Sequence, residues 1–406
     1  AVMIGNYVTH IGRRAFAGCT GLTSITIPEG ITSIGDEAFY NCTGLTEINY
    51  NAAEVTDLTS YSRAFYSAEA LGESITVVFG DTVKSIPAYL FYNSNITRVT
   101  IGNNVTNIRE HAFYNCTRLT EINYNAANVT NLTSYSRVFR NAGTLGEGIT
   151  VVFGDTVKSI PDYLFYVSSS DKPNITSVTI GNNVTSIGIR AFAGCSGLTS
   201  ITIPEGITSI GDYAFSGCTG LTEIKYNAAE VKDLTNGGVF YNAGTLGEGI
   251  TVVFGDTVKS IPAYLFYNSN ITSVPIGNNV TSIGKSAFAD CSSLTSITIP
   301  KNITNIGDNA FGHCTGLTEI IYDVENLVDC SKYSGIFTRA GIKGEGITGT
   351  FTDTVQRIPA YLFYINTIDS SLNPNIKSVV IGSNVTSIGE SAFDGCTDLS
   401  NVYIKD

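Results

Sequence analysis

The nine cysteines are the residues of this chain best suited to redox or metal chemistry. Eight of them follow a recurring phenylalanine by three residues: Cys19, Cys42, Cys116, Cys195, Cys218, Cys291, Cys314 and Cys396. The ninth, Cys330, stands where related segments carry leucine. Neighbouring segments would bring Cys19 and Cys42 near disulfide distance, but alanine or serine fills the same slot elsewhere, so no disulfide is required. We expect small, buried, inert thiols and no metal centre, because there is no C-x-x-C motif.

The three histidines, His10, His111 and His313, are the candidates for general-base catalysis. They lie in widely separated segments, so they cannot form a Ser-His-Asp triad or a multi-histidine metal site. His313 is next to Cys314, but adjacent residues point in different directions, and Asn or Gly replaces the histidine in equivalent segments. We therefore predict no catalytic role for any of them.

Paired carboxylates would support glycoside hydrolysis only if they lay close together. Four glutamates recur at one position of a repeat: Glu47, Glu121, Glu223 and Glu319. Because they are three or four repeat units apart, their separation is about 14–19 Å at one strand spacing per unit. Glycosidase carboxylates are about 5–9.5 Å apart. The sequence therefore predicts a solvated face, with no catalytic residues, no cofactor and no enzyme activity.

The charge balance excludes other classes of partner. The chain has 23 Lys and Arg against 35 Asp and Glu, a net charge of −12, and no basic cluster. We expect no binding to nucleic acid and no attraction to anionic membranes. No apolar run approaches about 18 residues, so no membrane insertion is expected. The first residues lack a signal-peptide pattern, and we expect signal and anchor segments to lie outside this chain.

Repeated segments must position all of these side chains. One phenylalanine marks each copy: Phe16, Phe39, Phe65, Phe91, Phe113, Phe139, Phe165, Phe192, Phe215, Phe240, Phe266, Phe288, Phe311, Phe337, Phe363 and Phe393. The mean spacing is about 25 residues, within the range of leucine-rich repeats. The period predicts a solenoid of about 16 coils that stabilise one another by stacking.

Each coil is expected to begin as a strand and to return through a turn. Leu22, Ile25 and Ile27 alternate as in a strand whose apolar residues point inward. Asp36 is placed to cap a short helical or 3-10 turn that carries Phe39 into the core. Some copies carry an insertion on the return segment, which belongs in a surface loop. No linker interrupts the array, so we predict that residues 1–406 form a single domain.

The pattern A-F-x-x-C-x-x-L-T-x-I-x-I-P-x-x-I-T-x-I-G resembles the BspA-type, or Treponema-type, leucine-rich repeat. Residues 15–34 carry it in full, and residues 191–210 and 287–306 carry it nearly so. The resemblance covers essentially the whole chain. It implies an α/β repeat solenoid, a right-handed superhelix of short parallel strands with short helical or 3-10 turns. It also implies a bacterial surface or secreted protein of a family implicated in adhesion, without a shared catalytic site.

Outward-facing strand residues are the candidates for contact with a partner. The polar and charged ones are Glu47, Asn49, Arg98, Glu121, Asn123, Glu223, Lys225 and Glu319. This face is poor in the Trp, Tyr and Arg that dominate interface hot spots, so we expect weak or multivalent contact. Tyr61, Tyr135 and Tyr333 in the inserted loops are the alternative anchors, unless each ring packs over its own insertion.

The repeat architecture, the low charge and the missing catalytic constellation favour a non-enzymatic bacterial protein at the cell surface or secreted. Its expected role is adhesion, through binding to extracellular host or microbial proteins. Two alternatives stay open. One is a structural spacer that displays another segment. The other is a carbohydrate-binding module that uses tyrosine rings as stacking platforms for glycans.

Overall fold

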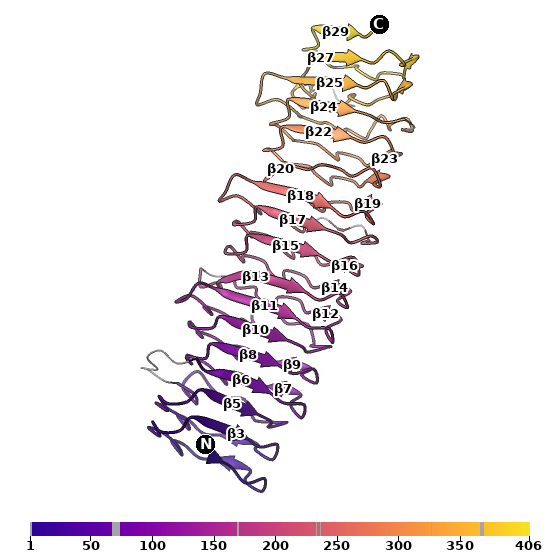
Figure 1. Cartoon of the computed structure of the whole chain (residues 1–406). Coiled ribbons are helices and arrows are strands. Elements are labelled where there is room, and N and C mark those ends of the chain that lie inside the picture. Colours follow the sequence, from indigo (N-terminus) through magenta and orange to yellow (C-terminus); the bar gives the residue numbers. More distant parts are fainter. Residues whose placement is uncertain are drawn as a thin grey trace. The chain divides into compact units, whose positions relative to one another are not determined.

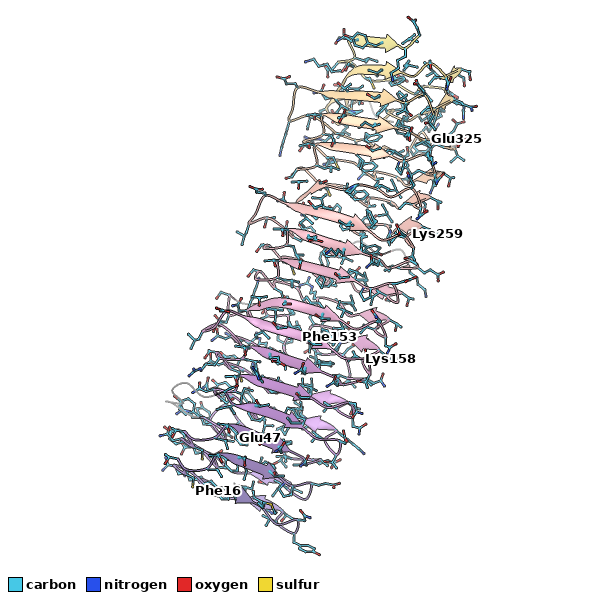
Figure 2. All side chains as sticks on the ribbon, in the orientation of Figure 1. Phe16, Glu47, Phe153, Lys158, Lys259 and Glu325 are labelled. Atoms are coloured by element: carbon cyan, nitrogen blue, oxygen red, sulfur yellow. The ribbon has the colours of Figure 1, made fainter. Side chains whose placement is uncertain are left out.

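Parallel strands dominate the computed structural model of the chain, which describes residues 2–66, 74–168, 170–232, 234–235, 237–325, 327–365 and 369–406. The chain divides into two compact units, Ala1–Thr199 and Ser200–Asp406. Within each unit, Figure 1 shows longer strands stacked in one layer and shorter strands along a second side. Lys158 and Lys259 lie on the side of the shorter strands, whereas Glu47 lies on the layer of longer strands (Figure 2). The predicted solenoid of parallel strands is confirmed, and the single domain stays a prediction.

The longer strands of the first unit form one parallel sheet. In spatial order they are β1 (Val2–Met3), β3 (Ser24–Ile27), β5 (Glu47–Tyr50), β6 (Thr76–Phe79), β8 (Arg98–Ile101), β10 (Glu121–Tyr124), β11 (Ile149–Phe153) and β13 (Ile175–Ile180). The shorter strands are β2 (His10–Ile11), β4 (Ser33–Ile34), β7 (Ser85–Ile86), β9 (Asn107–Ile108), β12 (Ser159–Ile160) and β14 (Ser186–Ile187). They pair in parallel as β2–β4, β7–β9 and β12–β14.

The longer strands of the second unit form two parallel sheets. The first contains β15 (Ser200–Ile203), β17 (Glu223–Tyr226), β18 (Ile250–Phe254) and β20 (Ile271–Ser273). The second contains β22 (Ser296–Ile299), β24 (Glu319–Tyr322), β25 (Ile347–Phe351), β27 (Ile376–Ile381) and β29 (Asn401–Ile404). The shorter strands are β16 (Ser209–Ile210), β19 (Ser260–Ile261), β21 (Ser282–Ile283), β23 (Asn305–Ile306), β26 (Arg357–Ile358) and β28 (Ser387–Ile388).

A proline accounts for the short strand β20. Pro275 stands where β13 of the first unit carries Thr179. Proline has no backbone N–H to donate to a neighbouring strand, so it cannot continue a ladder. Strand β20 accordingly ends at Ser273, whereas β13 runs on to Ile180.

Alternation along the strands builds the core. In β3, Ile25 and Ile27 are buried and lie opposite Ile48 and Tyr50 of β5. The Tyr50 ring in turn packs edge-on against Phe79 of β6, with ring centroids 5.3 Å apart. Each coil therefore covers the apolar face of its neighbour, as the sequence pattern predicts.

The repeat phenylalanines stack into a ladder in each unit. From Phe16 to Phe192, the centroids of successive rings are 4.9–5.8 Å apart. From Phe215 to Phe393, the spacing is 5.2–5.5 Å. Offset-stacked rings at this distance contribute dispersion and burial energy beyond that of isolated side chains.

The turns that carry these rings are not helical, so the helical turn expected after Asp36 is wrong. Glu37 and Asn41, two residues before and after Phe39, adopt left-handed backbone with φ of 56° and 60°. The N–H groups of residues 37, 39 and 41 donate to carbonyl oxygens of the next coil, at 2.5–2.8 Å. Residues 38, 40 and 42 instead donate three residues back. A helix cannot form because alternate N–H groups leave the turn. The one helix of the described residues is the 3-10 helix η1 (Ser370–Leu372).

Candidate functional site

The open face of the first sheet brings five of the predicted contact residues together. Glu47 lies opposite Thr76, which lies opposite Arg98, which lies opposite Glu121. Asn49 and Asn123 belong to the adjacent column, two residues further along their strands. Glu47 and Glu121 are therefore three strand steps apart, about 14 Å. That separation exceeds the spacing of a glycosidase pair.

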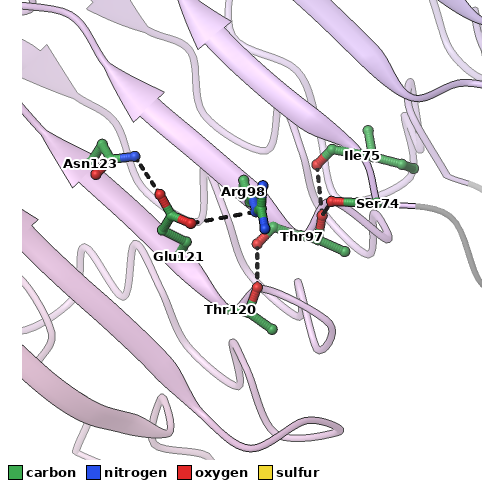
Figure 3. Close-up of polar contacts among 7 residues, drawn as sticks. All are labelled: Ser74, Ile75, Thr97, Arg98, Thr120, Glu121 and Asn123. Atoms are coloured by element: carbon green, nitrogen blue, oxygen red, sulfur yellow. Dashed lines mark hydrogen bonds and ion pairs between the residues drawn. The ribbon is translucent and has the colours of Figure 1, made fainter.

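Polar contacts within this face already occupy its carboxylates (Figure 3). Nε of Arg98 lies 3.4 Å from Oε2 of Glu121, and Nδ2 of Asn123 donates to Oε1 of Glu121 at 2.7 Å. Asn49 donates in the same way to Glu47, at 2.8 Å. Exposed ion pairs contribute about 0–1 kcal/mol, so these contacts are easily exchanged. A partner at the open face would replace them.

Threonine hydroxyls fix the edge of the open face where the strands begin. Oγ1 of Thr120 donates to the carbonyl of Thr97 at 3.1 Å, and Oγ1 of Thr97 donates to that of Ile75 at the same distance (Figure 3). Oγ1 of Thr318 makes the equivalent bond to Thr295 in the second unit. These threonines, which directly precede or begin a strand, thus link their coils to the preceding ones.

A hollow marks the rim where the strands of the same face end. Its volume is about 490 Å³. Val78 and Thr100 line it from the open face, and Asp81 and Asp155 line it from the turns that follow β6 and β11. Both aspartates are exposed. The open face is therefore concave at this rim.

The remaining predicted contact residues lie on two other sheets. Glu223 and Lys225 are on β17, where Nζ of Lys225 lies 2.9 Å from Oε1 of Glu223. Glu319 is on β24, opposite Thr348 of β25. The eight residues are thus distributed over three hydrogen-bonded sheets.

The three loop tyrosines are exposed. The exposed fractions are 84% for Tyr61, 74% for Tyr135 and 69% for Tyr333. Each precedes a repeat phenylalanine by four residues. The alternative that each ring packs over its own insertion does not agree with this exposure. Tyr333 has a cation beside it, since Nζ of Lys332 lies 5.0 Å from its ring centre.

The family is decided by a profile that matches nearly the whole sequence. The profile of the BspA type leucine rich repeat region matches in six copies, and the matched residues are 1–76, 61–172, 158–248, 234–334 and 356–406. The chain belongs to the BspA-type leucine-rich repeat family. The strand ladders and the repeat period agree with that assignment.

Solved structures of bacterial leucine-rich repeat proteins are similar to this BspA-type chain. One from Bacteroides ovatus is 23% identical with a TM-score of 0.51, and the alignment covers 100% of this chain and 92% of that protein. One from Eubacterium ventriosum is 25% identical with a TM-score of 0.37, covering 78% and 82%. A leucine rich cell surface protein from Faecalibacterium prausnitzii is 23% identical with a TM-score of 0.34, covering 100% and 86%. Comparison with curated proteins gives no match.

The repeat cysteines of this BspA-type chain bind backbone. Sγ of Cys42 donates to the carbonyl of Phe16 at 3.1 Å, and Sγ of Cys314 donates to that of Phe288 at 3.2 Å. Burial raises the pKa of Cys42 to about 11. The pairs that neighbouring coils bring together, such as Cys19 with Cys42, form no disulfide within the described residues. The expected small, buried thiols agree with Cys42 and Cys314, whereas Cys19 is exposed and does not fit that expectation.

The histidines occupy three unrelated environments. His10 hydrogen-bonds with Oγ1 of Thr9, the His111 ring stacks on Tyr89, and Nδ1 of His313 lies 3.5 Å from Oδ1 of Asp290. Among the described residues, no group of three or more His, Cys, Asp or Glu side chains could hold a metal ion. In the same part of the chain, no helix has the length and apolar character needed to cross a membrane.

Sequence reasoning missed one group of side chains that flanks the phenylalanine ladder. In the first unit, tyrosines recur directly after the phenylalanine: Tyr40, Tyr66, Tyr92, Tyr114 and Tyr166. Tyr40 stacks on Tyr66 and Tyr92 stacks on Tyr114. The signal was present in the recurring Phe-Tyr dipeptide. The dipeptide alone does not indicate the left-handed backbone that aligns these rings between coils.

Proposed function

We propose that this chain is a non-enzymatic, extracellular or cell-surface scaffold that binds host or microbial proteins and mediates adhesion. The exposed rings of Tyr61, Tyr135 and Tyr333 carry the proposal. Tyrosine is among the residues that dominate binding energy at protein interfaces. Three such rings at one repeat position provide similar contacts that act together through avidity.

The open face supplies the polar part of the same proposal. One parallel sheet offers exchangeable ion pairs and amide groups, from Glu47, Asn49, Arg98, Glu121 and Asn123. Glu223, Lys225 and Glu319 are proposed as lesser contacts of the second unit. Polar groups of this kind contribute specificity more than affinity.

Binding of residues 1–406 to immobilised extracellular-matrix proteins, mucins and glycans at physiological salt tests this function. Saturable binding to a protein supports it. Binding to glycans alone supports the carbohydrate-binding alternative, which also draws on the exposed tyrosine rings. Failure to bind any member of the panel contradicts adhesion and leaves the structural spacer.

A further inference from the structure

Half-buried aromatic side chains flank the phenylalanine ladder of the first unit at two repeat positions, two residues before and one residue after the ring. We define the aromatic cluster as Tyr89, Tyr92, His111, Tyr114 and Arg140. Tyr89 stacks on His111 and Tyr92 stacks on Tyr114, each with ring centroids 5.0 Å apart. The Arg140 guanidinium lies 5.2 Å from the centre of the Tyr114 ring. The cluster is therefore continuous across three coils.

Left-handed backbone holds the cluster in register. Tyr89 and His111 both have φ of 56°. Their N–H groups donate to the carbonyl oxygens of Glu110 and Ser136 in the next coil, at 3.2 and 2.9 Å. This conformation costs a side-chain-bearing residue about 1–2 kcal/mol, and Gly335 avoids that cost at the equivalent position. Large rings thus occupy a position whose left-handed backbone favours glycine.

Cations concentrate at one end of the cluster. Arg137 follows His111 in the next coil at the same repeat position. Nη2 of Arg140 lies 2.6 Å from Oδ2 of Asp171. In contrast, Nε of Arg137, Nε of Arg140 and Nδ1 of His111 are buried without a hydrogen-bond partner among the described residues. Because Nε of Arg137 is buried, an incoming acceptor has to reach the Nη groups, which form no ion pair among the described residues.

Two more arginines of the same unit lie over tyrosine rings. The Arg63 guanidinium lies 5.6 Å from the ring centre of Tyr66, and that of Arg190 lies 5.4 Å from the ring centre of Tyr166. In a chain with a net charge of −12, three arginines of the first unit lie over tyrosine rings and Arg137 lies near His111, with the carboxylates of Glu110 and Asp171 close by. Tyr and Arg together are the composition of protein-interface cores.

The second unit provides an internal comparison. The same two repeat positions carry tyrosines there too: Tyr213, Tyr241, Tyr264, Tyr267, Tyr361 and Tyr364. None of these positions carries arginine. Instead, a hydrogen bond with Glu390 raises the pKa of Tyr361, and burial together with nearby Asp290 raises that of Tyr267. The cationic character belongs to the first unit alone.

The geometry selects the kind of partner. The stacked pairs Tyr89–His111 and Tyr92–Tyr114 have interplanar angles of 14° and 17°. The rings of each pair cover one another's faces, so the cluster presents ring edges and hydroxyls more than the faces on which sugars stack. Guanidinium groups match carboxylates in a two-pronged hydrogen-bonding geometry. A long polyanion would be repelled by the overall negative charge of the chain. These conditions favour a protein segment that carries a few carboxylates.

We infer that the aromatic cluster, together with Arg137, is a docking surface for a carboxylate-bearing segment of a partner protein. The segment places a carboxylate on Arg137 and hydrogen-bonds with the tyrosine hydroxyls. This surface is distinct from the loop anchors Tyr61 and Tyr135, so the docking proposal and the adhesion proposal can be tested independently.

The test uses the full chain and a fluorescein-labelled peptide of alternating Glu and Tyr, with fluorescence anisotropy as the readout. A matched peptide has Gln in place of Glu. We expect the Glu-containing peptide to bind about tenfold more tightly. Arg137→Ala should weaken the binding of the Glu-containing peptide about tenfold. Arg137→Lys should weaken it less, because lysine keeps the positive charge but cannot form two parallel hydrogen bonds to a carboxylate. Lys158→Ala, which removes an exposed cation on the side of the shorter strands, is the matched control and should leave binding unchanged.

Three results would overturn the inference. They are equal binding of the two peptides, an Arg137→Ala variant that binds as the parent does, and tighter binding of a sulfated glycan fragment than of the Glu-containing peptide. The thermal midpoint of each variant shows that it is folded. A Tyr61→Ser/Tyr135→Ser variant should bind the peptide normally, which separates this surface from the proposed adhesion anchors.

Discussion

The thiol of Cys116 donates a hydrogen bond to the carbonyl oxygen of Phe91 in the preceding coil, with Sγ 3.1 Å from the oxygen. Cys291 makes the same bond to Phe266 at 3.2 Å. The recurring cysteine is thus a small buried donor that satisfies a backbone acceptor of the phenylalanine ladder. Ser269 performs a comparable task within its own coil by donating to Phe266. This explains why serine is tolerated in the slot.

Thiol reactivity should separate one cysteine from the rest. Burial raises the pKa of Cys116 and of Cys291 to about 12, so neither forms the reactive thiolate at neutral pH. Cys19 is exposed. With an aromatic disulfide reagent at about pH 8, close to the usual thiol pKa, the folded chain should show a single fast-reacting thiol. Cys19→Ser should abolish that fast phase. Several fast thiols in the parent would contradict the buried ladder.

Removing one ring from the ladder should destabilise the chain. Phe113 is fully buried and lies 5.8 Å from Phe91 and 5.0 Å from Phe139, centroid to centroid. Phe113→Ala should cost about 3–5 kcal/mol in the free energy of unfolding, because it leaves a cavity. Tyr135→Ala, at an exposed ring, should cost less than about 0.5 kcal/mol.

Scanning calorimetry of Phe113→Ala also tests the single domain. If residues 1–406 unfold as one domain, a single transition should move to lower temperature as a whole. Residues after Thr199 would give a second transition at the parent temperature if the two compact units unfolded separately. That second outcome would contradict the prediction.

The stability of the chain should depend on His111 in mildly acidic solution. Burial lowers the pKa of His111, and Arg137 and Arg140 lower it further, while Glu110 opposes them. The folded state thus resists protonation that the unfolded chain accepts below its ordinary pKa of about 6.5. Stability should be fully present above that pH and should fall as the pH drops through it. His111→Asn, which tolerates left-handed backbone, should reduce the loss, measured as the urea midpoint.

The control for this pH effect is His10→Asn. His10 is exposed and lies outside the aromatic cluster. That variant should lose stability on acidification as the parent does. An unchanged pH dependence in His111→Asn would show that other groups cause the loss.

Much of the fold follows from the sequence because burial alternates along each strand. Ile25 and Ile27 are predicted to point inward and are buried in β3. The period fixes which residues lie opposite one another, so the distance between Glu47 and Glu121 could be estimated from strand spacing alone. These features depend on local patterns that repeat without change.

The turns could not be predicted in the same way. Glu37 and His111 adopt left-handed backbone, which residues other than Gly and Asn rarely adopt, so their residue types did not predict this conformation. Their positions depend on hydrogen bonds to the next coil, which is a tertiary effect. Sequence reasoning consequently expected a helical turn after Asp36, and it missed the alignment of Tyr92 with Tyr114.

Partner binding by the loop tyrosines is the central claim, and one affinity measurement tests it most directly. The binding of the parent chain to the protein found in the adhesion panel is compared with that of Tyr61→Ser/Tyr135→Ser/Tyr333→Ser. The matched control is Leu145→Ser/Leu246→Ser, which changes two side chains that are each 77% exposed in other loops. We predict that the tyrosine variant binds at least about 30-fold more weakly, since interface hot spots contribute about 2 kcal/mol or more. The control should bind as the parent does. Equal affinity of the tyrosine variant and the parent would contradict the account.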